Sequence, residues 1–227
     1  MRRLMGIVAS VAIVAGAAGC GDLAAGGAQT KPGTAAGYVP PQAQIASAKA
    51  KLAELPTAVP DRTGYQRTRN FGPAWSVDTD RNGCGTRDDI LRRDLTKVQL
   101  RGRCTVIGGV IADPYTGATI TFRKAQADLV QIDHVVPLAA AWSLGAKAWT
   151  QRQRERFAND PLNLMATSRH ANLSKGDSTP SQWLPRPEFR CTYAVRYVQV
   201  SGAYRLAVTP ADRTTLATLL RACPAGR

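Results

Sequence analysis

The chain has 227 residues and a formal net charge of +14; it is long enough for one substantial domain with flanking segments, and the lack of an internal repeat excludes a solenoid. The excess of Lys and Arg favours a polyanionic partner, because basic groups gain free energy by releasing counterions from phosphates. A basic surface that keeps an extracellular protein soluble, or close to an anionic cell wall, explains the charge equally well.

The amino terminus has the order of a secretory signal. Arg2 and Arg3 precede an apolar run that is too short to span a bilayer comfortably. The segment from Ala17 to Cys20 resembles a bacterial lipobox, although Leu is more usual than Ala17; this interpretation removes residues 1–19 and lipidates Cys20. Ordinary cleavage after Ala17 is the alternative. Both interpretations export the protein, either anchored to the outer face of the cell membrane or secreted.

Residues 20–43 are rich in Ala, Gly, Thr and Pro and hold few large apolar side chains. They predict a disordered tether in front of a folded domain over 44–227. The spacing of Ile45, Ala48 and Leu52 predicts a helix over 44–55. The folded domain therefore begins with a short amphipathic helix.

The cysteines fit a disulfide framework, because export allows disulfides to persist. Apart from Cys20 the chain has four cysteines. We favour pairing Cys84 with Cys104 and Cys191 with Cys223, because each pair brackets a compact local segment. A zinc site is the competing interpretation. No two of these cysteines are close enough in sequence to form a CxxC knuckle, which disfavours zinc.

The segment before the next helix has oxygen-bearing side chains and a glycine at the spacing of a calcium-binding EF-hand loop: Asp78, Asp80, Asn82, Gly83 and Asp89. Ca²⁺ at the Asp78 loop is disfavoured, because Gly85 stands where an apolar residue is usual and the last ligand is Asp instead of the longer Glu. No good helix precedes the loop either. We favour a disulfide-tied turn, after which Thr86 caps a helix over 86–95.

Strands and then helices are predicted in the middle of the chain. β-Branched residues predict strands over 105–111 and 118–122, joined by a turn that contains Pro and Gly. A further strand over 129–132 delivers Asp133 and His134 at its end. Helices follow over 138–144 and 150–157, the second with a Thr cap.

The remaining chain continues this pattern. A short strand over 162–167 leads into a helix that Ser168 caps and that runs through Asn172. The order strand, excursion, strand, helix therefore surrounds the polar residues of the centre. Residues 191–200 fit either a strand or a helix, and a final helix is predicted over 210–223.

Asp133, His134, Asn163 and Asn172 are candidates for a phosphodiesterase centre. Cleavage of a phosphodiester needs an activated water, neutralised charge on the phosphorane and a stabilised leaving oxygen. We expect His134 to deprotonate the water, while Asp133 and Asn172 hold one divalent cation on the scissile phosphate and the leaving 3′ oxygen. Asn163 is expected to bond backbone and so to keep His134 in its working orientation.

The motifs that hold these residues, "IDHVVPL", "NDPLNL" and "ANLSKGDSTP", resemble the HNH nuclease family in its His-Asn-Asn variant. They are also similar to secreted actinobacterial HNH proteins and to the C-terminal nuclease domain of GmrSD-type restriction systems. The resemblance extends over about residues 65–223. It implies an α+β fold with a ββα-metal (His-Me finger) core over about 129–177, extra helices and a β-hairpin. It also implies an endonuclease that uses Mg²⁺, or Mn²⁺ as second choice, and leaves a 5′ phosphate on DNA or RNA.

Four further residues are candidate substrate contacts: Lys175, Arg154, Arg156 and His170. Helical geometry places residues two apart about 200° from each other, so Arg154 and Arg156 do not share a face and His170 does not share a metal with Asn172. We therefore assign Asn172 to the metal and His170 to the phosphate flank. A solvated surface explains the arginines equally well, and a structural ion pair explains the lysine.

Three functions compete for this sequence. An exported metal-dependent endonuclease that acts on nucleic acid, DNA in the first place, accounts for the motifs. A non-catalytic cell-surface module that captures extracellular DNA would use the same scaffold and basic surface. A calcium-stabilised cell-wall protein would rest on the Asp78 loop alone. The sequence identifies no protein partner, and it places membrane contact only at a lipidated Cys20.

Overall fold

The computed structural model describes residues 39–75, 78 and 81–224, which lie within one structural unit, Lys31–Arg227. The predicted signal segment, Cys20 and most of the predicted tether fall outside the described residues, as does Asp80 of the candidate calcium loop. None of the described helices combines the length and the apolar character that a membrane span requires.

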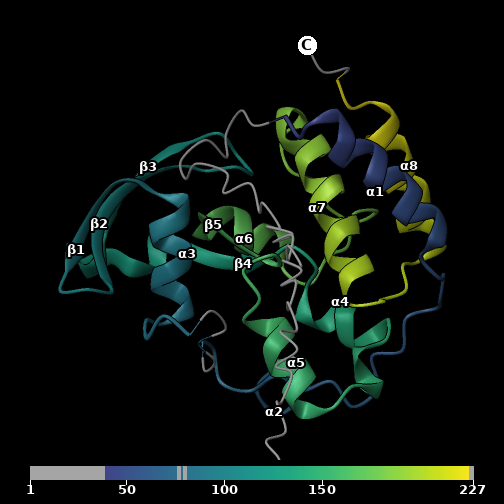
Figure 1. Cartoon of the computed structure of the whole chain (residues 1–227), viewed down its shortest axis with the longest axis horizontal. Helices are drawn as coiled ribbons and strands as arrows, with labels where there is room; N and C mark the ends of the chain where they lie inside the picture. Colours follow the sequence, from purple (N-terminus) through teal and green to yellow (C-terminus); the bar gives the residue numbers. More distant parts are fainter. Residues whose placement is uncertain (1–38, 76–77, 79–80, 225–227) are drawn as a thin grey trace, which may run out of the picture. The chain divides into compact units, whose positions relative to one another are not determined.

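The described residues form a mixture of helices and antiparallel strands, which confirms the predicted α+β class (Figure 1). The helices are α1 (Gln42–Glu54), α2 (Arg67–Phe71), α3 (Thr86–Asp94), α4 (Leu138–Ser143), α5 (Gln151–Ala158), α6 (Arg169–Lys175), α7 (Arg190–Ala203) and α8 (Pro210–Arg221). Short 3-10 turns are η1 (Lys124–Leu129), η2 (Ala146–Ala148) and η3 (Pro187–Phe189).

The strands of the described chain form two antiparallel sheets. The first contains, in spatial order, β1 (Thr96–Arg101), β2 (Thr105–Ala112) and β3 (Thr119–Arg123). The second pairs β4 (Val130–His134) with β5 (Leu164–Ser168). α6 follows β5 directly, so two antiparallel strands and a helix stand in the order expected around the candidate site.

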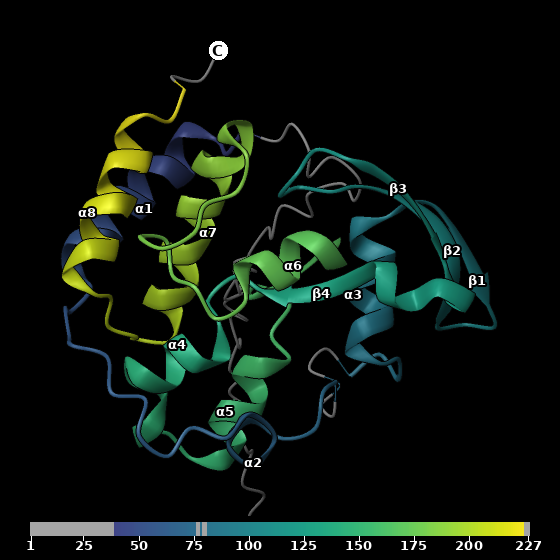
Figure 2. The ribbon, with the colours of Figure 1, turned by 180° about the vertical axis from the view of Figure 1, so that it is seen from behind.

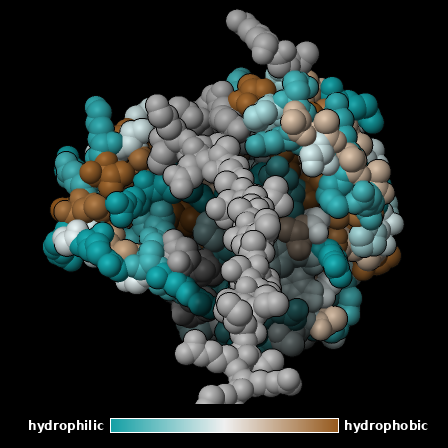
Figure 3. Space-filling model, in the orientation of Figure 1, coloured by the Kyte–Doolittle hydropathy of each residue, from teal (hydrophilic) through white to brown (hydrophobic). Residues whose placement is uncertain are grey.

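The buried apolar side chains form two clusters in the described residues. The larger cluster contains residues of α1, α7 and α8, which pack on one another (Figures 1 and 2). The smaller cluster joins α3 to both sheets through Leu91, Ile111, Phe122, Ile132 and Leu164. Hydrophilic side chains predominate on the face shown in Figure 3, with hydrophobic ones scattered among them. The strand pair of the candidate site is therefore anchored in the smaller cluster.

Side-chain caps begin several helices where the sequence predicts them. Thr150 accepts a hydrogen bond from the backbone N–H of Gln153 at the start of α5, and Ser168 accepts one from Ala171 at the start of α6. Thr209 caps α8 in the same way. Because a cap satisfies a backbone donor that the helix leaves unpaired, these residues set the helix starts.

Other features of the fold differ from the prediction. The N-cap of α3 is Gly85, and Thr86 is instead the first helical residue and is buried. β1 is absent from the prediction, because it is an edge strand whose residues are mostly exposed and show no alternation of buried side chains. Residues 191–200, which fit a strand or a helix, lie in α7.

Both predicted disulfides, Cys84–Cys104 and Cys191–Cys223, are present. The first ties the Asp78 loop to the turn between β1 and β2. In that loop the backbone N–H of Gly83 donates to Asp78 Oδ2 at 2.8 Å, and Asn82 Nδ2 donates to Asp89 Oδ1 at 3.0 Å. The loop oxygens thus accept hydrogen bonds from within the segment, as in a disulfide-tied turn.

Loss of the Cys191–Cys223 bridge should destabilise the fold, because it closes a long loop between α7 and the end of α8. Replacing both cysteines by Ser should lower the free energy of unfolding by about 3–4 kcal/mol, measured by urea denaturation. The Cys84→Ser/Cys104→Ser variant is the matched control and should lose slightly less, because its loop is shorter. Four free thiols in the purified oxidised protein would contradict both pairings.

Candidate active site

β4 carries Asp133 and His134 at its last two positions. Because neighbouring side chains of a strand point to opposite faces, the carboxylate and the imidazole point away from each other. Asp133 contacts Lys175 of α6, which packs on β4 and β5, whereas His134 contacts the backbone of Ala158 at the end of α5. The two groups therefore have separate surroundings.

Asn163 connects the two halves of the candidate site from a fully buried position, with 0% of its surface exposed. Its Oδ1 accepts a hydrogen bond from Val136 N at 2.8 Å, and its Nδ2 donates to Val136 O at 3.1 Å. Its own carbonyl accepts from Val135 N at 2.8 Å. These contacts cross the excursion between β4 and β5 and hold the backbone that follows His134, as the sequence predicts for Asn163.

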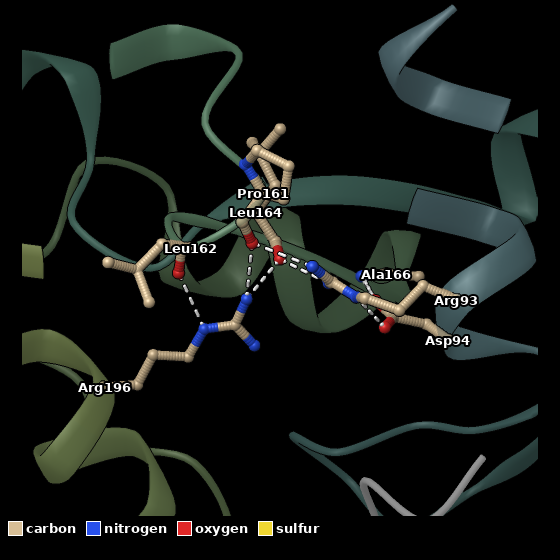
Figure 4. A network of polar contacts seen from close by, with 7 residues as sticks. All are labelled: Arg93, Asp94, Pro161, Leu162, Leu164, Ala166 and Arg196. Carbon is tan, nitrogen blue, oxygen red and sulfur yellow. Dashed lines mark hydrogen bonds and ion pairs between the residues drawn. The ribbon is translucent and has the colours of Figure 1, made fainter. Parts of the chain in front are cut away.

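Two arginines hold the loop that carries Asn163 (Figure 4). Arg93 comes from α3 and Arg196 from α7, and both donate to the same two carbonyls, those of Pro161 and Leu164. The four donor–acceptor distances lie between 2.6 and 2.9 Å. Hydrogen bonds from a charged donor are stronger than neutral ones, so this loop is firmly held on both sides of Asn163.

The two guanidinium groups of this network have different electrostatic surroundings. Asp94 pairs with Arg93 at 2.6 Å and also accepts a hydrogen bond from Ala166 N of β5 at 2.8 Å. Burial, together with the neighbouring charge of Arg93, lowers the pKa of Arg196 to about 10. Arg196 therefore stays charged at neutral pH and remains a charged donor to the loop.

The imidazole of His134 is buried and fixed in one orientation. Its Nε2 lies 2.8 Å from Ala158 O. A carbonyl only accepts, so Nε2 carries the proton of the neutral ring and Nδ1 holds the lone pair. The indole of Trp75 lies nearly parallel to the ring, at an interplanar angle of 9° and a centroid distance of 6.0 Å. Burial lowers the pKa of His134 to about 3, so the ring is neutral at physiological pH.

Asp133 is neutralised by a buried lysine. Lys175 Nζ lies 3.0 Å from the Asp133 carboxylate and also donates to His134 O at 2.8 Å. The Tyr115 hydroxyl donates to Asp133 Oδ2 at 2.6 Å. Burial and the adjacent carboxylate raise the pKa of Tyr115 well above its usual range, so the phenol stays protonated as a donor. The carboxylate is thus fully engaged in the described arrangement.

This arrangement of Asp133 does not fit a divalent cation. Both carboxylate oxygens already interact with Lys175 or Tyr115, and a cation bound to them would lie against the Lys175 ammonium at strongly repulsive distance. Among the residues that the structure describes, no group of three or more His, Cys, Asp or Glu side chains could hold a metal ion. The metal role of Asp133 and Asn172 stays a prediction that requires Lys175 to move.

Asn172 and His170 occupy different positions on α6. Asn172 Nδ2 donates to Gln131 Oε1 at 2.8 Å. Gln131 lies two residues before Asp133 on β4, so Asn172 is on the side of the strand that Asp133 faces. His170 is exposed. The structure thus brings Asn172 to the Asp133 side of the site and leaves His170 at the surface.

Arg154 and Lys175 do not offer free charges to a phosphate. The Arg154 guanidinium donates to backbone carbonyls, among them Asn70 O at 2.8 Å. The Lys175 ammonium is buried against Asp133. The substrate contacts of both residues stay predictions, and each would require its side chain to leave the internal partners that it has in the fold. Arg156 is exposed on α5 and remains a candidate phosphate contact.

Several partners of the site were not predicted from the sequence. Tyr115 reaches the candidate carboxylate from the turn between β2 and β3, and Trp75 stacks on the candidate base from the segment before α3. Arg93 and Arg196 belong to helices distant from the motifs. Tyr115 lies in the predicted turn and Trp75 in an aromatic segment. Neither sequence feature indicates that Tyr115 contacts Asp133 or that Trp75 stacks on His134.

Replacement of Arg196 by Lys should weaken the loop that carries Asn163. A lysine keeps the charge but lacks the planar guanidinium that donates to the three carbonyls of Pro161, Leu162 and Leu164, so these acceptors lose a partner. We expect the free energy of unfolding to fall by about 1.5–3 kcal/mol in urea denaturation. Arg152→Lys on the exposed side of α5 is the matched control and should change it by less than about 0.5 kcal/mol. If the two variants lower the free energy of unfolding equally, Arg196 does not stabilise the loop that carries Asn163.

Known proteins similar to this chain share the region of the candidate site. The family model of the C-terminal domain of GmrSD restriction endonucleases matches residues 85–219. A protein of Arthroderma benhamiae, named "Uncharacterized secreted protein", is 40% identical over 189 residues, which cover 81% of this chain and 89% of that protein. No solved structure matches. The chain therefore belongs to the family of GmrSD restriction endonuclease C-terminal domains.

Proposed function

We propose that this protein is an exported endonuclease that hydrolyses phosphodiester bonds of DNA, or of RNA, with His134 as its general base. Membership in a restriction-endonuclease domain family supports a nuclease-related function in general. The observation that carries the finer proposal is the geometry of the His134 ring. Its Nε2–H is held by Ala158 O, which leaves the Nδ1 lone pair as the one acceptor of the ring.

His134 would accept a proton from the attacking water at Nδ1. The water oxygen forms a bond to phosphorus, the bond from phosphorus to O3′ breaks, and the leaving oxygen takes a proton from solvent. The products are a 5′ phosphate and a 3′ hydroxyl. The hydrogen bond to Ala158 keeps the ring in one tautomer and stabilises the imidazolium that forms. The indole of Trp75 lies parallel to this ring, with the two centroids 6.0 Å apart.

The cofactor that we propose from the HNH resemblance is Mg²⁺, with Mn²⁺ as second choice. A bound divalent cation supplies charge neutralisation at the phosphate. The buried contact between Lys175 and Asp133 supports a second candidate function, a non-catalytic cell-surface module that binds DNA without cutting it. In that case the lysine would be the permanent partner of the carboxylate.

Export is proposed on independent grounds. The structure contains two disulfides, which persist outside the cytoplasm. The Arthroderma benhamiae relative is named as a secreted protein. We propose that residues 1–19 act as a signal peptide and that the mature protein is either secreted or anchored through lipidated Cys20. The nuclease would then meet nucleic acid outside the cell membrane.

Replacement of His134 by Ala should lower the cleavage rate by about 10²–10⁴-fold, because the water loses its base. The measurement is a gel of supercoiled plasmid incubated with wild-type or variant protein in Mg²⁺, Mn²⁺ or EDTA. Wild-type protein should nick or linearise the plasmid with at least one metal and leave it intact in EDTA. The variant should leave it intact in every condition.

Circular dichroism and thermal unfolding of the His134→Ala protein provide the control for its fold. Cleavage by this variant at the wild-type rate would contradict the assignment of His134 as the general base. Intact plasmid with wild-type protein in every metal, together with salt-sensitive DNA binding, would favour the DNA-capture module instead.

Asn172 and His170 should differ in their effect on cleavage, because Asn172 lies on the Asp133 side of β4 and His170 is at the surface. We expect Asn172→Ala to lose most of the activity and His170→Ala to retain the larger part, measured as initial rates on the same plasmid. Loss of cleavage in His170→Ala with retention in Asn172→Ala would reverse the two roles.

A further inference from the structure

The open face of the β1–β2–β3 sheet has a concavity of about 780 Å³. Val106, Ile111 and Phe122 of the same sheet join the smaller core cluster, where α3 packs against β2. In both ribbon views the three strands lie away from α1 and α8 (Figures 1 and 2). The concavity is therefore a surface feature of the sheet and shares no residue with the candidate active site.

Long polar side chains gather along this concavity. Lys97, Gln99 and Arg101 of β1 all line it, and the pairing of β1 with β2 is irregular between Thr96 and Leu100. Gln99 pairs with Gly108 of β2, which in turn pairs with Arg123 of β3. The side chain of Gln99 lies over Gly108, where an added Cβ would come within 2.7 Å of Gln99 Oε1. The sheet thus forms a trough with basic side chains on both sides.

The positive charge of the trough is not balanced by acidic side chains. Lys97, Arg101, Arg123 and Lys124 line it, and no described Asp or Glu does. All four cations are exposed, and no ion pair within the described chain involves them. Other exposed cations do have such partners; Lys147, for example, lies 2.6 Å from a carboxylate. The trough therefore presents an uncompensated positive field to solvent.

We propose that this basic trough binds the sugar-phosphate backbone of the nucleic acid that the protein acts on. The inference rests on the proposed function and deepens it by naming where the substrate is held outside the cleavage centre. Four exposed cations that line one concavity attract a phosphate backbone, and such contacts position a nucleic acid without reading its sequence. A hollow of this size receives a strand backbone, whereas an anionic bilayer requires a flat or convex basic surface.

The trough is joined to the candidate active site by a short, packed segment. β3 continues through η1 into β4, and η1 packs against β2, β3 and β4. Lys124 begins η1, and His134 ends β4. Nucleic acid bound along the sheet is therefore held in a defined relation to the strand that carries the base.

Binding measured apart from cleavage tests this proposal. The protein is the His134→Ala variant in EDTA, and the probe is a fluorescein-labelled DNA duplex followed by anisotropy over a series of NaCl concentrations. The added substitutions Lys97→Glu, Arg101→Glu and Arg123→Glu should weaken binding at low salt by at least about 30-fold. The slope of log K against log salt concentration should fall by about 3.

The matched control carries Lys49→Glu, Arg205→Glu and Arg221→Glu, which change the net charge equally at exposed positions remote from the trough. It should keep binding within about 5-fold, with a slope changed by less than about 1. The three Gln substitutions at the trough positions give the same comparison with half the charge change if the Glu variant does not fold.

Equal losses in the two triple variants would overturn the proposal, because net charge alone would then explain binding. Unchanged DNA binding with selective loss of phosphatidylglycerol vesicle binding would also overturn it and assign the trough to a membrane. Plasmid gels with His134 restored separate the two proposals. If the wild-type protein cleaves plasmid but the two triple variants lose the same DNA affinity, the proposal for the trough fails and the nuclease proposal stands. If plasmid stays intact but only the trough variant loses DNA affinity, the nuclease proposal fails and the proposal for the trough stands.

Discussion

The amide side chain of Asn163 is the contact on which the candidate site depends. It bonds both the N–H and the C=O of Val136, so the backbone just after His134 has one position relative to the loop before β5. Arg93 and Arg196 donate to carbonyls on both sides of Asn163. One arginine comes from a helix of the smaller core cluster and the other from a helix of the larger one. The loop therefore ties the two clusters together, and the fold and the site share the same support.

His134 and Asp133, at the end of β4, differ in how well their surroundings suit the roles proposed for them. His134 is neutral, and its hydrogen bond to Ala158 O directs Nδ1 to the proton that the proposed base accepts, while burial lowers its pKa to about 3 and so weakens it as a base. Asp133 is neutralised by Lys175, and breaking a buried pair by removing one partner costs about 3–5 kcal/mol. In a metal-dependent nuclease Lys175 would have to leave the carboxylate when a cation binds, whereas in a DNA-capture module it would stay. The same contact thus separates the two functions.

Features set by local chemistry were predictable from the sequence, and features set by distant contacts were not. Thr150 predicts the start of α5, because a cap acts within one helical turn. The two cysteine pairings were predictable because each bridge closes a local segment of the chain. The Asn163 contact follows from its motif. By contrast, Arg196 and Tyr115 reach the site from other parts of the chain. The sequence reveals the charge of Lys175 but does not reveal that folding places it against the carboxylate of Asp133. β1 escapes prediction because its residues are mostly exposed.

The orientation of the His134 ring can be observed directly by ¹⁵N-resolved NMR of the imidazole groups. The chain has two histidines, and the His170→Gln variant leaves the signals of His134 alone. At neutral pH we expect a neutral ring that is protonated at Nε2, where Ala158 O accepts, and unprotonated at Nδ1. A ring protonated at Nδ1, or one that exchanges freely between the two tautomers, would contradict the role of His134 as an oriented base.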